Sequence, residues 1–140
     1  MKVLVDTSVW VDFFNDYPSR EHAALADLIE GGEEICTCGV IVAEMFQGLR
    51  RETGRNEIRA LFRQMTFLEP LSIELYLRAA EVYRLLRRKG RTVRSTIDCL
   101  IAVIAEENGC RVLARDRDLE TILTSGIVKS TLWRLDPSAG

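Results

Sequence analysis

The sequence is poor in the residues on which most metal sites and many hydrolases depend. His22 is the only histidine in 140 residues, and the four cysteines, at positions 36, 38, 99 and 110, form no CxxC pair. Zinc-site spacing is therefore absent, and catalysis by a pair of histidines is excluded. We expect His22 to be a surface residue and the cysteines to be buried free thiols.

Long apolar runs and glycine-rich phosphate loops are also missing. No segment is apolar for long enough to cross a bilayer, and the N-terminus, with one lysine and a short apolar run, does not resemble a signal peptide. We therefore expect a cytoplasmic protein without a membrane partner. The chain contains neither GxxxxGK[ST] nor GxGxxG, so nothing supports a nucleotide-binding loop.

Charge of one sign is not in large excess. The formal net charge of −2 argues weakly against a nucleic-acid partner, but the distribution of charge matters more. The basic residues cluster at Arg50, Arg51 and Arg55, and again at Arg87, Arg88, Lys89, Arg91 and Arg94. The second cluster has two interpretations: a solvated or dipole-favoured helix end, or a surface that binds phosphates.

The chain alternates between strand-like and helical segments. Short strand-like segments are expected at 2–5, 33–38, 67–71, 111–114 and 131–135, and helices at 7–15, 19–32, 39–52, 55–65, 72–90, 95–109 and 118–126. This alternation is typical of a parallel sheet covered by helices on both faces. The sequence thus predicts an α/β protein: a single three-layer α/β/α domain over residues 1–140, with about five mostly parallel strands.

Three aspartates lie at the ends of the predicted elements. Asp6 ends the first strand and Asp116 follows another, and in an open parallel sheet ligands bind beyond the carboxyl ends of the strands. Asp6 also has the simpler interpretation of a helix cap. Asp98 opens a very apolar helix, either as part of a capping box begun by Ser95 or as an acid beside the core.

Glu44 lies in the middle of a predicted helix, where no cap explains it. It is either the solvated shoulder of that helix or an acid with room beside it, because Gly48 follows one turn later. Grouped carboxylates repel one another, and the pKa of at least one rises unless a cation joins them. A site of carboxylates alone suits Mg²⁺ or Mn²⁺, and such sites commonly bind phosphate and activate water.

Four segments carry a family resemblance. In order and spacing, "VDTSVWVDFF", "GVIVAEMFQGLR", "TIDCLIAVIAEENG" and "VLARDRDLE" resemble the acidic motifs of PIN-domain ribonucleases, and most closely those of VapC-type toxins from bacterial toxin–antitoxin pairs. The resemblance covers essentially the whole chain. It implies a PIN-like fold in which Asp6, Glu44 and Asp98 are the core acids. Asp116 would be the fourth, with Asp118 as its companion or alternative.

The resemblance also implies an activity. Mg²⁺ or Mn²⁺, held by these five acids, would support endonucleolytic hydrolysis of tRNA, rRNA or mRNA to 5′-phosphate and 3′-hydroxyl ends, which inhibits translation. Ser8 would orient Asp6 by a hydrogen bond, whereas Thr7 either supports the site or only starts the helix. The residues expected to guide the RNA backbone are Arg87, Arg88, Arg91 and Arg94.

The partners implied are a cognate VapB-type antitoxin, whose C-terminal segment would cover apolar helices and block the acidic pocket, and a second copy in a homodimer. Met45, Phe46 and Leu49 either belong to that surface or to the core, and Trp10 and Trp133 are expected to pack. Three alternatives remain open: a catalytically idle PIN-like module that binds RNA or protein, a PIN nuclease of RNA processing outside any toxin system, and a receiver-like domain. The last lacks a clear candidate for the lysine that faces a phosphoacceptor aspartate.

Overall fold

Four parallel strands form the sheet in residues 1–135, the part of the chain that this computed structural model describes. β1 (Lys2–Val5) lies between β2 (Glu34–Thr37) and β4 (Arg111–Leu113), and β3 (Thr66–Phe67) pairs with the outer edge of β2. Val3, Leu4 and Val5 are fully buried, as expected for a central strand of a sheet covered on both faces. The predicted parallel α/β architecture is confirmed.

The prediction of a fifth strand at 131–135 is wrong. Leu132 makes a single parallel bridge to Val112, with hydrogen bonds from Val112 N to Thr131 O at 2.9 Å and from Trp133 N to Val112 O at 2.7 Å. β4 is only three residues long, so its outer edge supports one bridged pair and no ladder. Residues 136–140 of the expected domain lie outside the described part of the chain.

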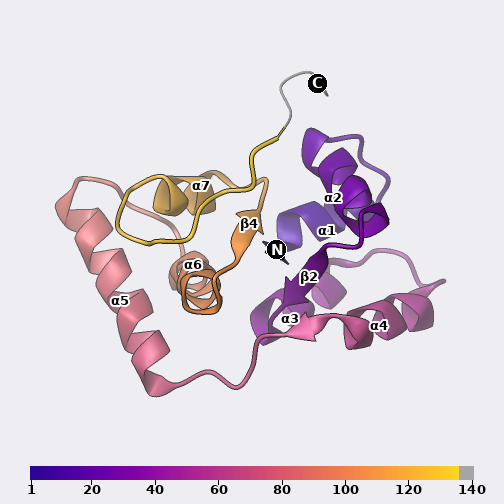
Figure 1. Cartoon of the computed structure of the whole chain (residues 1–140), viewed down its shortest axis with the longest axis horizontal. Helices are drawn as coiled ribbons and strands as arrows, with labels where there is room; N and C mark the ends of the chain where they lie inside the picture. The colour runs from indigo at the N-terminus through magenta and orange to yellow at the C-terminus, as the bar shows by residue number, and fades with distance from the viewer. Residues whose placement is uncertain (136–140) are drawn as a thin grey trace.

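Seven helices flank the sheet in residues 1–135. They are α1 (Thr7–Phe14), α2 (Arg20–Glu30), α3 (Gly39–Gly48), α4 (Arg55–Gln64), α5 (Ile73–Arg88), α6 (Thr96–Asn108) and α7 (Arg117–Leu123). Figure 1 shows α5, α6 and α7 together on one side of the strands and α1 to α4 on the other, which gives the predicted three layers. None of these helices is long and apolar enough to cross a membrane.

Side-chain caps set the starts of the helices. Asp6, Ser19, Ser72, Ser95 and Asp116 each accept a backbone N–H from the first turn that follows. α3 is different, because its N-cap Cys38 makes no such bond. The carboxylate of Glu69 supplies it instead, accepting the N–H of Gly39 at 3.1 Å. A Cβ at residue 39 would stand only 2.7 Å from that oxygen, so glycine suits this close approach.

The core lies where the apolar patterns predict it. All seven residues from Cys99 to Ala105 in α6 are buried, because α5 and α7 pack against this helix. α3 stops at Gly48 instead of running to residue 52, and Leu49 turns to extended backbone and is buried. The four cysteines are buried free thiols, as predicted.

Candidate functional site

Asp6 is a buried carboxylate at the junction of β1 and α1. Its backbone N–H donates to Leu113 O of β4 at 2.9 Å, and its Oδ2 accepts from Ser8 N at 3.2 Å and from Ser8 Oγ at 2.6 Å. Asp6 therefore caps α1, as the simpler interpretation held. The residue is 5% exposed. Burial raises the pKa of Asp6, with smaller increases from the carboxylates of Asp116 and Glu44, while the bonds from Ser8 oppose the shift.

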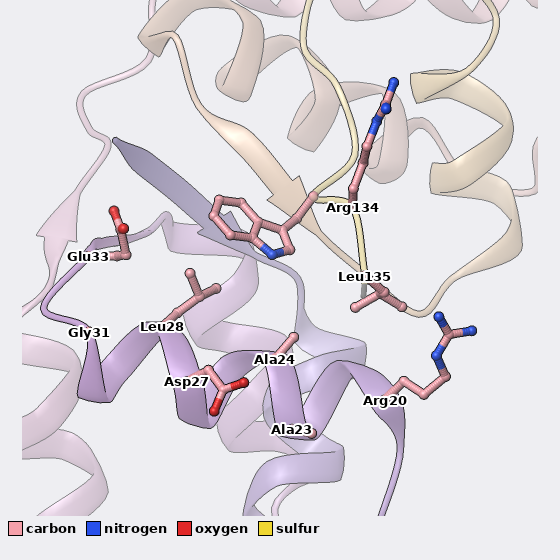
Figure 2. A pocket seen from close by; sticks show the side chains of 10 residues that line it. Arg20, Ala23, Ala24, Asp27, Leu28, Gly31, Glu33, Arg134 and Leu135 are labelled. Atoms are coloured by element: carbon pink, nitrogen blue, oxygen red, sulfur yellow. The ribbon is translucent and has the colours of Figure 1, made fainter. Parts of the chain in front are cut away.

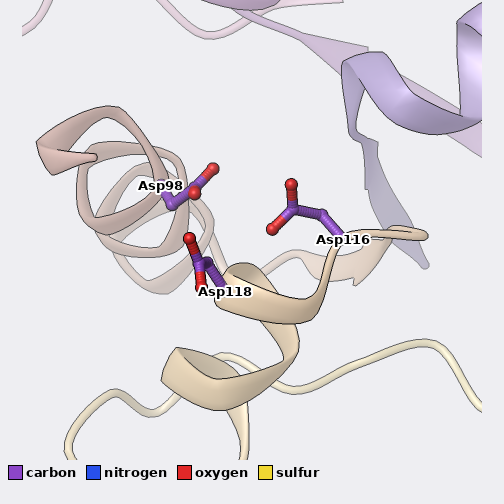
Figure 3. Close-up of side chains that lie close together, drawn as sticks. All are labelled: Asp98, Asp116 and Asp118. Carbon is purple, nitrogen blue, oxygen red and sulfur yellow. The ribbon is translucent and has the colours of Figure 1, made fainter. Parts of the chain in front are cut away.

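Three further aspartates meet beside it. Asp98 comes from the first turn of α6, Asp116 from the residue before α7, and Asp118 from the first turn of α7. Figure 3 shows their side chains pointing toward one another, and one carboxylate oxygen of each lies within 4.8 Å of the others. All three residues are partly buried, so little water separates their charges.

The pKa of Asp98 shows how crowded these charges are. Burial, followed by four neighbouring carboxylates, raises it from 3.8 to about 7. In decreasing order of effect, these neighbours are Asp116, Asp6, Asp118 and Glu44. The structure thus brings Asp98, Asp116 and Asp118 within ligand distance of one another and places Asp6 and Glu44 near enough to act on the charge of Asp98. Asp6 and Asp116 follow β1 and β4, at the edge where a parallel sheet binds its ligands.

Asp98 is not part of a capping box among the described residues. The hydroxyl of Ser95 accepts from Ile97 N at 3.0 Å, and no hydrogen bond returns from Asp98 to Ser95. The Asp98 side chain points instead to Asp116 and Asp118, as Figure 3 shows. The capping-box interpretation is therefore wrong, and the interpretation as an acid beside the core is the one that fits.

Glu44 comes from α3, whereas Asp98, Asp116 and Asp118 come from α6 and the start of α7. It is exposed on α3, and its Oε1 accepts a hydrogen bond from Thr7 Oγ1 at 3.1 Å. Because Thr7 directly follows Asp6, this bond joins α3 to the start of α1. Thr7 thus does more than begin a helix: it holds the Glu44 carboxylate toward Asp6.

Asp116 and Asp118 have different partners. Asp116 Oδ1 accepts from Leu119 N at 2.9 Å and caps α7. Asp118 Oδ2 accepts from both Arg94 N at 3.1 Å and Arg94 Nε at 3.2 Å. Arg94, expected to guide RNA, therefore offsets part of the charge of Asp118.

The other arginines of the second basic cluster lie close by along the chain. Arg87 and Arg88 occupy the last turn of α5, which agrees with the dipole-favoured interpretation. Arg91 follows that helix and lines a hollow of about 490 Å³ together with Arg117 and Glu120 of α7. Their side chains are exposed, so they are available to a phosphate backbone as well.

Sequence reasoning missed an ion pair beside the acids, between the buried Asp12 and the exposed Arg115. Asp12 of α1 is 5% exposed, and its carboxylate accepts from Arg115 Nε at 2.7 Å, Arg115 Nη2 at 2.9 Å and Ser19 Oγ at 2.8 Å. The guanidinium also lies 4.7 Å from the centroid of the Tyr17 ring. The available signal was weak: an aspartate set between Val11 and Phe13 in an apolar helix.

The donor set fits a hard divalent cation. Its members are carboxylates, with no histidine or cysteine ligand in the group, and oxygen ligands of this kind suit Mg²⁺ or Mn²⁺. Burial is the largest cause of the raised pKa values of Asp6 and Asp98, and repulsion from the neighbouring carboxylates adds to both when no cation is bound. A cation would remove that repulsion.

Two of the hollows are lined by none of the five acids. One, of about 250 Å³, separates α2 from Arg134 and Leu135, as Figure 2 shows. The other, of about 600 Å³, lies along α4; we call it the α4 groove. It is lined mainly by three aromatic and three basic side chains: Phe46, Phe62, Phe67, Arg55, Arg59 and Arg63.

Several residues have packing roles. Met45 and Leu49 are buried in the core, and only Phe46 of that trio reaches the α4 groove. Trp10 is fully buried, as predicted, and Trp133 lies over Arg111 and beside α2.

His22 lies at the surface with intermediate exposure, near the start of α2. Its ring packs against Phe13, with centroids 5.1 Å apart, and its Nδ1 lies 2.8 Å from the Tyr17 carbonyl oxygen.

The amino-acid sequence is similar to those of known proteins. Residues 3–122, which include all five acids, match the PIN domain family. Ribonuclease VapC11 of Mycobacterium tuberculosis is 33% identical over 121 residues, which cover 86% of this chain and 90% of the relative. VapC ribonuclease Mb1587 of Mycobacterium bovis matches with the same identity and coverage.

Among solved structures, VapBC2 from Rickettsia felis, bound to a DNA fragment from its promoter, aligns with a TM-score of 0.72 at 17% identity. The alignment covers 97% of this chain and all of that one. The 33% identity across most of both chains supports a closer family assignment than the shared fold alone. The chain belongs to the PIN domain family, among the VapC proteins.

Proposed function

We propose that this chain is a Mg²⁺- or Mn²⁺-dependent endoribonuclease and the toxin of a VapBC-type toxin–antitoxin module. One observation carries the proposal: acids from four separate elements gather at one edge of the sheet, where one carboxylate oxygen each of Asp98, Asp116 and Asp118 lies within 4.8 Å of the others and the charges of Asp6 and Glu44 act on Asp98. Such crowding of carboxylates is unfavourable without a cation. The similarity to proteins named VapC ribonucleases supports RNA as the substrate.

Each acid has a proposed role. Asp6, Asp98 and Asp116 would hold the cation, with Asp118 and Glu44 as further ligands, and the cation would supply positive charge at the scissile phosphate and acidify a water. Ser8 fixes the Asp6 carboxylate by its 2.6 Å hydrogen bond, and Thr7 fixes Glu44. These side chains therefore keep the ligand oxygens oriented before RNA arrives.

The products should carry 5′-phosphate and 3′-hydroxyl ends. Attack by the RNA 2′-hydroxyl needs a general base and a general acid, usually histidines. His22 is the sole histidine, and it lies at the start of α2 against Phe13 and Tyr17. Hydrolysis by water at the acidic cluster is the reaction that this residue set supports.

Arg87, Arg88 and Arg91 would guide the RNA backbone toward the acids. They are exposed and follow one another along the segment that leads from α5 to α6, the helix that carries Asp98. Arg94 belongs to the same path, but its contact with Asp118 gives it a second role beside the cation site.

A VapB-type antitoxin is the proposed partner, and a homodimer the proposed assembly. A VapBC complex from Rickettsia felis is among the structures that share this fold. On this chain, the α4 groove offers an aromatic floor with a basic rim, which suits an acidic segment with apolar side chains. Bound there, beside α3, such a segment would lie close to Glu44.

The test is cleavage of total cellular RNA by the purified, partner-free protein, with Mg²⁺ or Mn²⁺ and with EDTA, followed by mapping of the product 5′ ends. Asp6→Asn and Asp98→Asn proteins serve as matched variants, because each keeps the side-chain shape and removes one charge. We expect discrete cuts that disappear with EDTA and with either substitution. A folded, metal-binding protein that cuts no RNA would instead be the idle binding module.

A further inference from the structure

Residue 115 is held at both its backbone and its side chain. Its N–H donates to Ser8 Oγ at 3.0 Å, and its guanidinium grips the Asp12 carboxylate through two hydrogen bonds of 2.7 and 2.9 Å. Both anchors, Ser8 and Asp12, belong to α1, the helix that Asp6 caps. The next residue along the chain is Asp116.

Two parts of the acidic cluster are thereby tied to one another. α1 carries the Asp6 end, and the segment between β4 and α7 carries the Asp116 end. The ladder between β1 and β4 ends with the bond from Asp6 N to Leu113 O, so no strand pairing reaches Asp116. Beyond Leu113, the connection runs through Ser8 Oγ and through Asp12.

Such a connection is needed because the two acids repel one another. Each carboxylate contributes to raising the pKa of Asp98, and Asp116 also raises that of Asp6. The short segment around Asp116 would relieve this repulsion by moving outward. A bidentate arginine–carboxylate pair resists that movement well, because its fork fixes direction as well as distance.

We propose that the Asp12–Arg115 ion pair is a positioning device that holds Asp116 at the distance from Asp6 required by a divalent cation. The inference rests on the proposed cation site. Arg115 is a positioning residue, since its charge is directed to Asp12 and its effect on the site passes through Asp116. Because the Arg115 side chain is 44% exposed, the pair contributes little to stability by attraction alone, and the fixed geometry of its two hydrogen bonds is the property that matters to the site.

The decisive variant is Arg115→Met, because an effect of charge and an effect of positioning would change the cation affinity in opposite directions. Removing a positive charge near the acids should tighten cation binding if charge alone matters. Loss of positioning should weaken it, by roughly 10- to 100-fold, as is typical when a residue supporting a metal ligand is removed. Arg117→Met is the matched control: it removes an exposed charge on the other side of Asp116, and we expect Mn²⁺ affinity that is unchanged or tighter.

The measurement is Mn²⁺ affinity of the partner-free protein by electron paramagnetic resonance, with folding checked by circular dichroism. Arg115→Lys keeps the charge without the fork, so we expect an intermediate loss. Arg115→Met leaves Asp12 buried and unpaired, which threatens folding. The Asp12→Leu/Arg115→Met double variant removes both partners and avoids that cost. We expect it to fold and still to bind Mn²⁺ weakly.

Each result has one meaning. Mn²⁺ affinity equal to wild type in the folded double variant and in Arg115→Lys overturns the positioning role, whether or not the protein cleaves RNA. Weakened binding in these variants, together with a wild type that cuts no RNA, leaves the positioning role intact and overturns the proposed nuclease. A wild type that binds no Mn²⁺ overturns both.

Discussion

The hydroxyl of Ser8 donates to Oδ2 of Asp6 across 2.6 Å, the length of a strong bond to a charged carboxylate. Oγ of Ser8 also accepts the backbone N–H of Arg115 at 3.0 Å. One side chain therefore orients the buried acid and connects it to the segment that carries Asp116. The hydroxyl and the backbone N–H of Ser8 both donate to Asp6, and both bonds lower the pKa of Asp6 against the effect of burial.

Replacing Ser8 with alanine should therefore damage the cation site more than the fold. Without the hydroxyl bond to Oδ2 the pKa of Asp6 rises further, although the backbone N–H of residue 8 still donates to it, and we expect Mn²⁺ affinity and cleavage each to fall roughly tenfold. The expected loss of stability is about 1 kcal/mol. The control is Ser72→Ala, which removes a similar cap from α5, far from the acids along the chain. Equal losses of Mn²⁺ affinity in the two variants would contradict the orienting role of Ser8.

Stability without metal should fall as pH rises through the raised pKa of Asp98. Its folded-state pKa of about 7 exceeds the ordinary 3.8, so the folded protein binds this proton more tightly than the unfolded chain does. The resulting stabilisation is complete below about pH 4 and is lost progressively up to about pH 7. The raised pKa of Asp6 acts in the same direction.

A cation binds the deprotonated acids, so its stabilising effect should increase over the same pH window. At a Mn²⁺ concentration about 100 times the dissociation constant measured at pH 8, we expect the free energy of unfolding to rise by about 2.7 kcal/mol at pH 8. The same concentration should raise it much less at pH 5. Thermal unfolding with and without Mn²⁺ at both pH values measures the difference. Asp98→Asn should unfold at a higher temperature than wild type in metal-free buffer at pH 8. An equal Mn²⁺ effect at both pH values would contradict the crowding of these acids.

The sequence predicted most strongly what is encoded locally. The apolar helix at 95–109 and the buried strand at 2–5 each carry a continuous signal, and Ser72 marks the start of α5. The fifth strand failed because strand formation depends on a partner, and β4 offers too short an edge. Local pattern contains no information about the length of a neighbouring strand.

Placement of the acids depended on two kinds of information. Asp6 and Asp116 follow strands, so sheet topology alone sends them to one edge. Glu44 lies mid-helix, where the room beside Gly48 only suggested a place in the group and the family resemblance assigned it there. The Asp12–Arg115 pair escaped both, because its partners lie 103 residues apart and neither belongs to the quoted acidic pattern as a ligand.

Asp116 and Asp118 should differ in their importance for the cation. Asp118 already accepts two hydrogen bonds from Arg94, whereas Asp116 accepts one, from the backbone of α7. We expect Asp116→Asn to weaken Mn²⁺ binding roughly 100-fold and Asp118→Asn roughly tenfold. Arg94→Met should tighten Mn²⁺ binding, because it removes the guanidinium charge and one of the two hydrogen bonds to Asp118, while the backbone N–H of residue 94 still donates to it. Titration of the three variants with Mn²⁺ decides the matter, and a larger loss in Asp118→Asn would reverse the assignment.

The remaining arginines should act on RNA and not on the cation. Arg87, Arg88 and Arg91 are exposed, and none has an acidic partner in an ion pair among the described residues. Each phosphate contact releases counterions, so replacing one of these residues with glutamine should lower the salt dependence of single-stranded RNA binding by roughly 0.7 in log–log slope. Mn²⁺ affinity should stay at the wild-type value. Arg20→Gln, an exposed arginine at the start of α2, is the matched control. If Arg20→Gln reduces the slope as much as Arg91→Gln does, the RNA does not follow the segment between α5 and α6, and the two arginines at the end of α5 serve its helix dipole alone.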